Sequence, residues 1–408
     1  MWRVLLNLAV RNIFRNRRRT ILTFFAIASG MASIIVFGGF VSYTYFALRE
    51  QTIHSQLGHL NVFKEGYSAH PGDASKYFIN DPDKVEQIIA TVPGVSTMTA
   101  RLGFSALIST GEKTMNCLAT GVVPGKEKEL SNAEMILSGH RLAAGDTNGV
   151  VLGSLLAESL GVKVGDTVTM LTTTASGMIN ARDLQIAGIA RVGSKEYDRV
   201  FVKLPLDVAQ HLLNTKEVER VVVLLNQTGD TAKVSDTLKQ KFAAAGMPLE
   251  IKTWHDLADF YQAVVRLYGG IFRVVNLIIA ALFLFGIANT LTMSIFERVR
   301  EIGTLRAIGT RRAGVRNMFL WEGFVMGLAG GVIGIFAGLI TAFFINLFGG
   351  FYIPPPPGMS DGYQAFISVD PGTVAYAFVL TVAVATLSSL YPALRAAKLN
   401  IVQALGHT

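Results

Sequence analysis

The chain has 408 residues, of which half are hydrophobic and only 16% are charged, and its mean hydropathy is +0.41. Such a composition is more apolar than a soluble domain requires. The net charge of +8 does not indicate a nucleic-acid surface, because the excess lies in two short stretches, residues 1–19 and 296–322, with six arginines each. We therefore expect a membrane protein with no nucleic-acid partner.

Four apolar runs are long enough to cross a hydrocarbon core about 30 Å thick as helices. They lie within residues 20–48, 255–296, 322–348 and 372–394. No acidic, basic or histidine side chain falls in the interiors of these runs, and Arg273 and Glu322 are expected at interfaces. By the positive-inside rule we expect both termini and the segment 297–321 in the cytoplasm, with residues 49–254 and 349–371 outside.

The first 19 residues form a basic amphipathic segment, which we expect to lie in the cytoplasmic interface as a helix that anchors and orients the chain. The following run begins like a secretory signal peptide. Because the apolar run continues to Phe46, we expect an uncleaved first membrane helix over residues 20–48. Gly30, Gly38 and Gly39 in this run favour close helix packing.

Residues 49–254 separate the first membrane helix from the second. Alternating patterns predict strands at 57–64, 95–109, 114–123, 149–152, 167–172, 183–192, 200–202, 219–225 and 249–253. Helices are expected from Pro82 onward and at 153–160, 205–213 and 231–245. These elements predict a large α+β domain inserted between membrane helices 1 and 2, in a membrane domain of four helices.

Residues 254–270 carry an apolar stripe at helical spacing and lead into the second run with Gly269 and Gly270 as the only break. Two interpretations remain open. The segment is either a stalk that passes rigid-body movement between the α+β domain and the membrane, or a helix that only packs against that domain. The stalk and the second membrane helix together occupy residues 255–296.

Residues 297–309, ERVREIGTLRAIG, form a short charged stretch between the second and third runs. Val299, Ile302, Leu305 and Ile308 recur at helical spacing and predict an amphipathic helix along the membrane surface. Gly309 is suited to end such a helix. Composition alone favours an interfacial segment whose arginines only hold the topology.

The sequence of this motif, ERxxEIGxLRAIG, closely resembles the signature of the MacB/LolC/LolE/FtsX family of ABC-transporter permeases. The segments LxNLxxRNIxRNxxRT at the start and YPALRAAKLNIVQAL near the end are also similar to this family. In the family the signature is a coupling helix that docks on a separate ATPase. The resemblance implies ATPase coupling by Glu297, Arg298, Arg300, Glu301, Ile302, Gly303, Leu305, Arg306, Ile308 and Gly309.

The resemblance also implies how the large domain is divided and what it works with. A porter-like part would comprise residues 49–124 and 215–254, with a smaller subdomain inserted at 125–214. The implied partners are a dimer of cytoplasmic ABC ATPase subunits, which would bind ATP and Mg, and a second permease chain, identical or different. A periplasmic carrier or adaptor protein and membrane lipid are further implied partners. This chain itself would hold no cofactor or metal. The implied location is the bacterial inner membrane.

The third run, residues 322–348, is rich in glycine at the spacing that lets helix backbones approach closely. The expected packing positions are Gly323, Gly327, Gly331, Gly334 and Gly338. Their partner is either the fourth run or a second protomer. The loop 349–371 contains Pro354–Pro357, which predicts a stiff external turn or a contact with a periplasmic partner. Residues 395–408 form a cytoplasmic tail.

The sequence contains no GxxxxGK[ST] or HExxH motif and only one cysteine, Cys117. Together with the family resemblance, this implies a transport subunit and not an enzyme, with ATP hydrolysed by the partner chain. The expected mechanism is mechanotransmission, in which hydrolysis drives movement of the periplasmic domain. Lack of a fused ATPase favours lipoprotein or lipid extraction. MacB-type efflux through an adaptor and outer-membrane duct, or FtsX-like regulation of a cell-wall hydrolase, are the alternatives.

Overall fold

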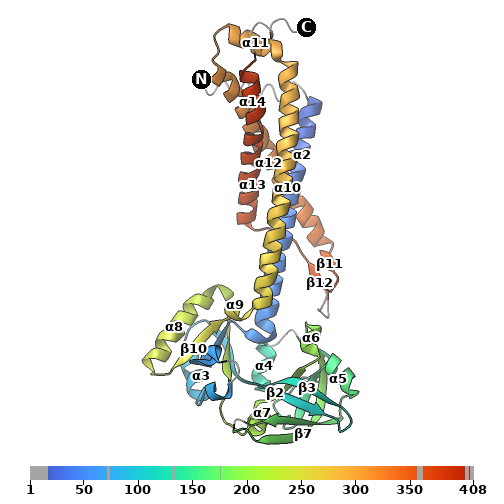
Figure 1. Cartoon of the computed structure of the whole chain (residues 1–408), viewed down its shortest axis with the longest axis vertical. Coiled ribbons are helices and arrows are strands. Elements are labelled where there is room, and N and C mark those ends of the chain that lie inside the picture. Colours follow the sequence, from blue (N-terminus) through green and yellow to red (C-terminus); the bar gives the residue numbers. More distant parts are fainter. Residues whose placement is uncertain are drawn as a thin grey trace. The chain divides into compact units, whose positions relative to one another are not determined.

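The structure, a computed structural model, describes residues 17–70, 74–130, 134–174, 176–355, 362–399 and 404. The chain divides into two compact units (Figure 1). The helical unit comprises Met1–Phe46, Val264–Tyr352 and Gln364–Thr408, and the α+β unit comprises Ala47–Ala263 and Ile353–Tyr363. The expected N-terminal amphipathic helix up to residue 16, the loop positions 356–361 and most of the tail after residue 399 lie outside the described residues.

Four of the described helices are long and apolar enough to cross a membrane, which confirms the expected membrane domain. They are α2 (Arg17–Thr52), α10 (Asp259–Glu297), α12 (Arg312–Leu347) and α13 (Pro371–Ser388), which is followed by α14 (Leu390–Ala397). The short helix α11 (Val299–Ala307) connects α10 to α12. Large apolar side chains such as Leu277 and Phe285 are exposed along these helices, as expected for surfaces that face lipid.

The fourth run is interrupted at Ser389, where a single helix over 372–394 was expected. Pro392 gives the physical reason. Its ring cannot donate a hydrogen bond to the carbonyl group of Ser388 and crowds that group, so the helix cannot continue regularly through this turn. At the other end, the Asp370 carboxylate caps α13 by accepting hydrogen bonds from the backbone N–H groups of Gly372 and Thr373.

Helix α10 runs without interruption from Asp259 to Glu297, so the expected break at Gly269 and Gly270 does not occur. The preceding residues form a separate short helix, α9 (Trp254–Leu257), which begins with a capping box between Thr253 and Asp256. The expected stalk therefore starts at Asp259 and not at residue 255. It is part of the same helix as the second membrane span.

The α+β unit is built on one ten-stranded sheet with the order β10-β1-β9-β2-β3-β8-β5-β7-β4, and β6 pairs with β2 and β7. The strands are β1 (Leu60–Lys64), β2 (Val95–Ser109), β3 (Thr114–Val122), β4 (Met135–Gly139), β5 (Gly149–Gly153), β6 (Thr167–Thr173), β7 (Ile179–Arg191), β8 (Phe201–Pro205), β9 (Arg220–Leu225) and β10 (Leu249–Thr253). A separate two-stranded sheet pairs β11 (Phe351–Ile353) with β12 (Tyr363–Ala365).

The helices of the α+β unit are short and pack on this sheet. They are α3 (Pro82–Ala90), α4 (Pro124–Leu130), α5 (Ser154–Leu160), α6 (Lys195–Asp198), α7 (Leu206–Leu213) and α8 (Thr231–Ala244). Single turns of other helix types occur at Ile53–Leu57, Tyr67–Ala69, Ala74–Tyr77 and Thr228–Asp230. The expected α+β class is confirmed by this arrangement. The structure adds β4 and α4, which the sequence pattern did not predict.

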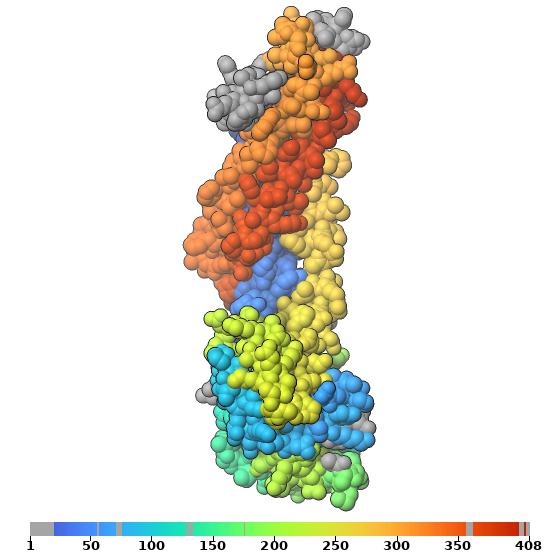
Figure 2. All heavy atoms as spheres, turned by 90° about the vertical axis from the view of Figure 1, so that its left-hand side faces the viewer, coloured from blue at the N-terminus to red at the C-terminus, as the bar shows by residue number. Residues whose placement is uncertain are grey.

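Two hydrophobic cores divide the sheet, and the long strand β2 contributes to both. Ala100 belongs to the core under α3 and α8, and α8 lies at the surface over this core (Figure 2). Leu102 belongs to the core under α5 and α7. The first half of β2 pairs with β9 through Arg101, whereas the second half pairs with β3 from Arg101 onward.

This division differs from the expected boundary between residues 124 and 125. The second half of β2 and all of β3 share a core with β5, β6, β7 and β8, so part of the segment 49–124 packs with the segment 125–214. Hydrophobic periodicity could not reveal the difference, because β2 is one continuous strand whose two halves have different neighbours.

Candidate coupling site

The candidate site is the segment that joins α10 to α12. Helix α10 ends at Glu297, and Arg298 then leaves helical geometry with φ −119° and ψ 19°. Helix α11 follows, and Gly309 turns the chain with φ +101°, a conformation that favours glycine. The regular part of the predicted helix is therefore shorter than residues 297–309, because Arg298 forms a hinge at one end and Gly309 a turn at the other.

One face of α11 is buried against the neighbouring helices. Val299, Ile302 and Gly303 are buried, and Ile302 packs in a core with Phe319 of α12 and Ala396 of α14. The other members of this core are Ile295, Val315, Met318, Ala393 and Ala397. The inner face of α11 is thus fixed to three helices of the helical unit by close apolar packing.

Arg306 fastens the C-terminal part of α11 to the end of α14. Its Nη1 atom donates hydrogen bonds to the backbone carbonyl oxygens of Ala397, at 3.2 Å, and Leu399, at 2.7 Å. Ala397 is the last residue of α14 and Leu399 lies two residues beyond it, so Arg306 is bonded at the end of a helix, where backbone acceptors are left unsatisfied and carry partial negative charge. Arg306, to which the family resemblance assigns ATPase coupling, therefore has polar contacts within its own chain that position α11 against α14.

Arg298 connects the hinge to two carboxylates. Its Nε atom donates a hydrogen bond of 3.0 Å to Glu301 in α11, and its Nη1 atom lies 3.9 Å from the Glu322 carboxylate in α12. Glu322 is only 4% exposed and lies well inside α12, which begins at Arg312. Glu322 was expected at the membrane interface, and the structure adds that its side chain is buried among neighbouring helices, because α12 extends further toward its N-terminus than the apolar run does.

The outward face of α11 retains a smaller set of the predicted residues. Glu297, Arg300 and Gly309 are exposed, and Ile308 is 75% exposed. Leu305 is half-buried, and Glu301 is held by Arg298. Exposed arginine and isoleucine side chains at the two ends of one short amphipathic helix are suited to a protein contact with apolar and charged parts.

The glycines of α12 pack against helices of the same chain on two sides. A Cβ atom on Gly327 would lie 2.8 Å from the Cβ of Ala385 in α13, and one on Gly334 would lie 2.5 Å from the Cβ of Met31 in α2. Gly323 and Gly331 face Ser389 and Phe378, and Gly338 faces Ile35. The predicted glycine face therefore has the fourth run as one partner and the first run as the other. Figure 2 shows α12 and α13 side by side.

Sequence reasoning did not identify Phe319, Ala396 or Glu322 as parts of this site. Phe319 and Ala396 looked like ordinary residues of apolar or small-residue stretches. The carboxylate of Glu322 was a detectable signal, because an acidic residue next to a glycine-rich apolar run requires a partner if the helix extends across it.

Two protein families cover most of the chain. Residues 20–241 match the MacB-like periplasmic core domain, and residues 273–401 match the FtsX-like permease C-terminal family. The chain is 26% identical over 355 residues to the lipoprotein-releasing system transmembrane protein LolE of Haemophilus influenzae, covering 82% of each chain. It is 24% identical to LolC of Neisseria meningitidis serogroup B, covering 95% of this chain and 93% of LolC.

A third relative is the macrolide export ATP-binding/permease protein MacB of Sodalis glossinidius, with 26% identity over 98% of this chain and 60% of MacB. An apolar four-helix unit with a MacB-like core domain and an FtsX-like C-terminal region defines a membrane permease. The chain belongs to the ABC-transporter permeases of the LolC/LolE/MacB type. The family resemblance first seen in the motif of residues 297–309 is thereby confirmed.

Proposed function

We propose that this chain is the permease subunit of an ABC transporter whose ATPase is a separate chain that docks on the outward face of α11. The observation that carries the proposal is the division of α11 into two faces. Arg300 and Ile308 are exposed, whereas Ile302 is buried between α12 and α14 and Arg306 is bonded to the end of α14. A force applied to the outward face would therefore be passed to α12 and α14.

The hinge at Arg298 extends this argument to α10. Because α10 is one uninterrupted helix from Asp259 to Glu297, a change of angle at the hinge would move a rigid element 39 residues long. Helix movement of this kind is a common way to transmit a local event over a distance. We propose that ATP binding and hydrolysis in the partner, with Mg, drive such movement, and that this chain performs no hydrolysis itself.

The proposed cargo is a lipoprotein or lipid, extracted from the outer leaflet of the bacterial inner membrane. The support is the similarity to LolE and LolC, which are named as transmembrane proteins of lipoprotein-releasing systems and which the chain matches at 26% and 24% identity. We propose two permease chains per complex with an ATPase dimer, cytoplasmic termini, and a periplasmic carrier or adaptor as the receiving partner.

Co-purification of the ATPase tests the proposal. The variants Ile308→Asp and Arg300→Glu change exposed side chains for which the structure gives no internal polar contact. Loss of an interface anchor costs about 2 kcal/mol or more, equivalent to roughly 30-fold in affinity. We expect both variants to insert normally and to lose most of the ATPase.

Ile179→Asp is the matched control, because Ile179 is 81% exposed but lies on β7 of the α+β unit. It should retain the ATPase fully. Normal ATPase recovery with both α11 variants would refute docking on this face.

A further inference from the structure

A groove of about 220 Å³ lies between α12 and α13 in the helical unit. It is lined by Asn317, Leu320, Trp321 and Phe324 of α12 and by Thr386 of α13. Trp321 and Phe324 pack edge to face with ring centroids 5.4 Å apart, and the Thr386 hydroxyl group donates a hydrogen bond within its own helix. The wall is therefore almost wholly apolar, and the volume is many times the roughly 10–15 Å³ that one water molecule needs.

Arg316 lies at the polar end of this groove. Its Nε and Nη2 atoms donate hydrogen bonds of 3.2 Å and 3.1 Å to Oδ1 of Asn317, so the guanidinium group is held beside a residue of the groove wall. These bonds use two of the five N–H groups of a guanidinium. The other three donate to none of the residues that the structure describes, and the side chain is only half-buried. Arg316 therefore has donors left for a ligand at this end of the groove.

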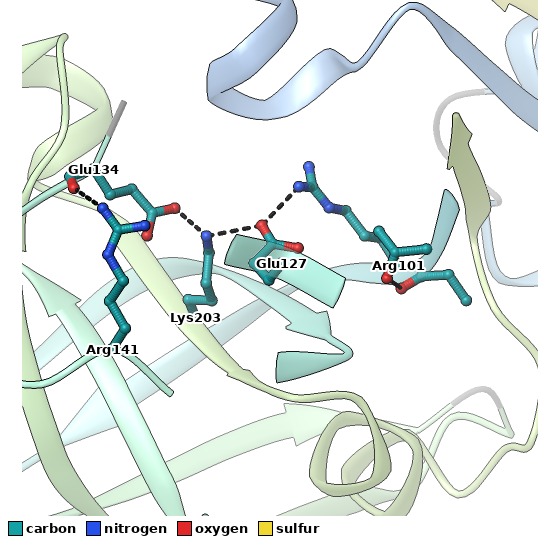
Figure 3. A network of polar contacts seen from close by, with 7 residues as sticks. Arg101, Glu127, Glu134, Arg141 and Lys203 are labelled. Atoms are coloured by element: carbon teal, nitrogen blue, oxygen red, sulfur yellow. Dashed lines mark hydrogen bonds and ion pairs between the residues drawn. The ribbon is translucent and has the colours of Figure 1, made fainter. Parts of the chain in front are cut away.

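Acidic side chains do not neutralise the positive charge at this end of α12. In the α+β unit, by contrast, the buried guanidinium group of Arg101 donates a hydrogen bond of 2.7 Å to the carboxylate of Glu127 (Figure 3). Arg311 and Arg312 lie about one helical turn before Arg316 and are exposed. Among the described residues, no carboxylate forms an ion pair with any of these three arginines. This end of the groove therefore favours an anion.

The surroundings of the groove indicate the class of ligand. The helical unit belongs to a membrane permease and its long apolar helices face lipid, so acyl chains are the apolar groups available to the groove. Tryptophan is typical of the level where the hydrocarbon core meets the headgroups. At that level a guanidinium group can bind a phosphate group through two parallel hydrogen bonds. Basic pockets between membrane helices bind anionic lipid headgroups in this way.

We propose that the groove is a binding site for one anionic phospholipid, in the leaflet on the side of α11. Its phosphate group binds Arg316, and one acyl chain lies along Trp321 and Phe324. A zwitterionic lipid such as phosphatidylcholine has the same phosphate, but its ammonium group would add positive charge beside the three arginines. The site requires only the membrane location of the helical unit, so it depends neither on ATPase docking nor on the transported cargo.

Fluorescence quenching by brominated lipids tests the site, because Trp321 itself lines the groove. In the full-length chain, phenylalanine replaces the other two tryptophans, Trp2 and Trp254. The protein is reconstituted in mixed bilayers of phosphatidylcholine and phosphatidylglycerol, in which one lipid or the other carries bromine on its acyl chains. Brominated phosphatidylglycerol should bind at least about fivefold more tightly, because one arginine near an anionic headgroup contributes about that factor. The difference between the unchanged chain and Trp321→Phe gives the same comparison in a protein that keeps Trp254.

Two arginine variants locate the binding. Arg316→Gln should lower the preference for phosphatidylglycerol by about fivefold. Arg273→Gln is the matched control and should keep the preference, because Arg273 is exposed on α10 but lies 24 residues, about 36 Å along the helix, before its end at Glu297. Equal quenching by the two brominated lipids would overturn the proposal and leave Arg316 to an acidic protein partner. An undiminished preference in Arg316→Gln, or an equal loss in Arg273→Gln, would also overturn it.

Discussion

Arg298 Nη1 lies 3.9 Å from the Glu322 carboxylate, so the hinge between α10 and α11 is tied to a buried acidic group inside α12. Arg298 lies between α10 and α11, Glu322 lies in α12, and both side chains are well buried. Charged groups at such depth are costly unless they are paired. This pair therefore connects the start of α11, the helix on which the ATPase would act, to α12 of the helical unit.

Arg298→Ala should destabilise the chain, because it leaves the buried Glu322 without its cation. Removing one partner of a buried pair costs about 3–5 kcal/mol, and we expect the lower end since the two groups are not hydrogen-bonded. The double variant Arg298→Ala/Glu322→Gln should recover much of the loss. Denaturant unfolding in detergent of the unchanged chain, Arg298→Ala, Glu322→Gln and the double variant gives the coupling free energy.

Glu301→Gln controls for the other partner of Arg298. Its carboxylate is more exposed, so the change should cost less than about 1 kcal/mol. If the changes in free energy of unfolding at Arg298 and Glu322 were strictly additive, the two side chains would not interact, and the ion pair would be contradicted.

Gly334→Ala should destabilise the helical unit. The new methyl group would lie 2.5 Å from Met31 Cβ and 3.0 Å from the backbone oxygen of Ala28, so α2 and α12 would have to separate. Overpacking of this kind costs about 1–3 kcal/mol. Gly270→Ala in α10 meets nothing within 4 Å and should be neutral or stabilising by up to about 1 kcal/mol. Thermal unfolding compares the two variants, and equal midpoints would argue against tight α2–α12 packing.

Acid should weaken the α+β unit through His59. Burial, followed by the nearby positive charge of His54, lowers the pKa of His59 to about 4, although Glu50 acts in the opposite direction. His59 Nδ1 accepts a hydrogen bond from Leu225 N–H, and its other ring nitrogen contacts Thr228 Oγ1, so the neutral ring is built into the fold.

In the unfolded chain the His59 ring takes up a proton below about pH 6.5, whereas in the folded chain it does so only at about pH 4. The contribution of the neutral His59 ring to the free energy of unfolding is therefore complete above pH 6.5. It is lost as the pH falls toward 4, by about 3 kcal/mol in total. His59→Gln should be less stable at neutral pH but less sensitive between pH 6.5 and 4. Parallel pH profiles of unfolding for the two proteins would disprove this assignment.

Single-cysteine labelling checks the proposed topology. The natural thiol gives little background, because Cys117 is 2% exposed and burial raises its pKa to about 12. A membrane-impermeant thiol reagent should label Ile179→Cys in cells with a permeabilised outer barrier. It should label Ile308→Cys only after the inner membrane is opened. The reverse pattern would place α11 outside the cell and exclude ATPase docking there.

The membrane helices and the position of α11 could be predicted from the sequence, because apolar length and helical periodicity are local properties. The roles of the charged residues within α11 could not. Whether Arg306 faces a partner or its own chain depends on carbonyl groups at Ala397 and Leu399, about 90 positions away. The burial of Glu322 was missed since an acidic residue at the edge of an apolar run looks interfacial.

The division of the α+β unit was also beyond sequence reasoning. Strand β2 has one continuous pattern, yet Ala100 and Leu102 belong to different cores because the strand changes neighbours at Arg101. Strand pairing between distant segments decides such a boundary, and periodicity carries no information on pairing.

Site-specific photo-cross-linking tests the central claim most directly. A photoreactive residue replacing Ile308 should form a cross-link with the co-purified ATPase. The same residue replacing Ile179, which is 81% exposed and lies in the α+β unit, should form none. A cross-linked permease–ATPase product from position 308 alone is the result that we predict. A product from position 179 and none from 308 would contradict the assignment of α11 as the docking helix.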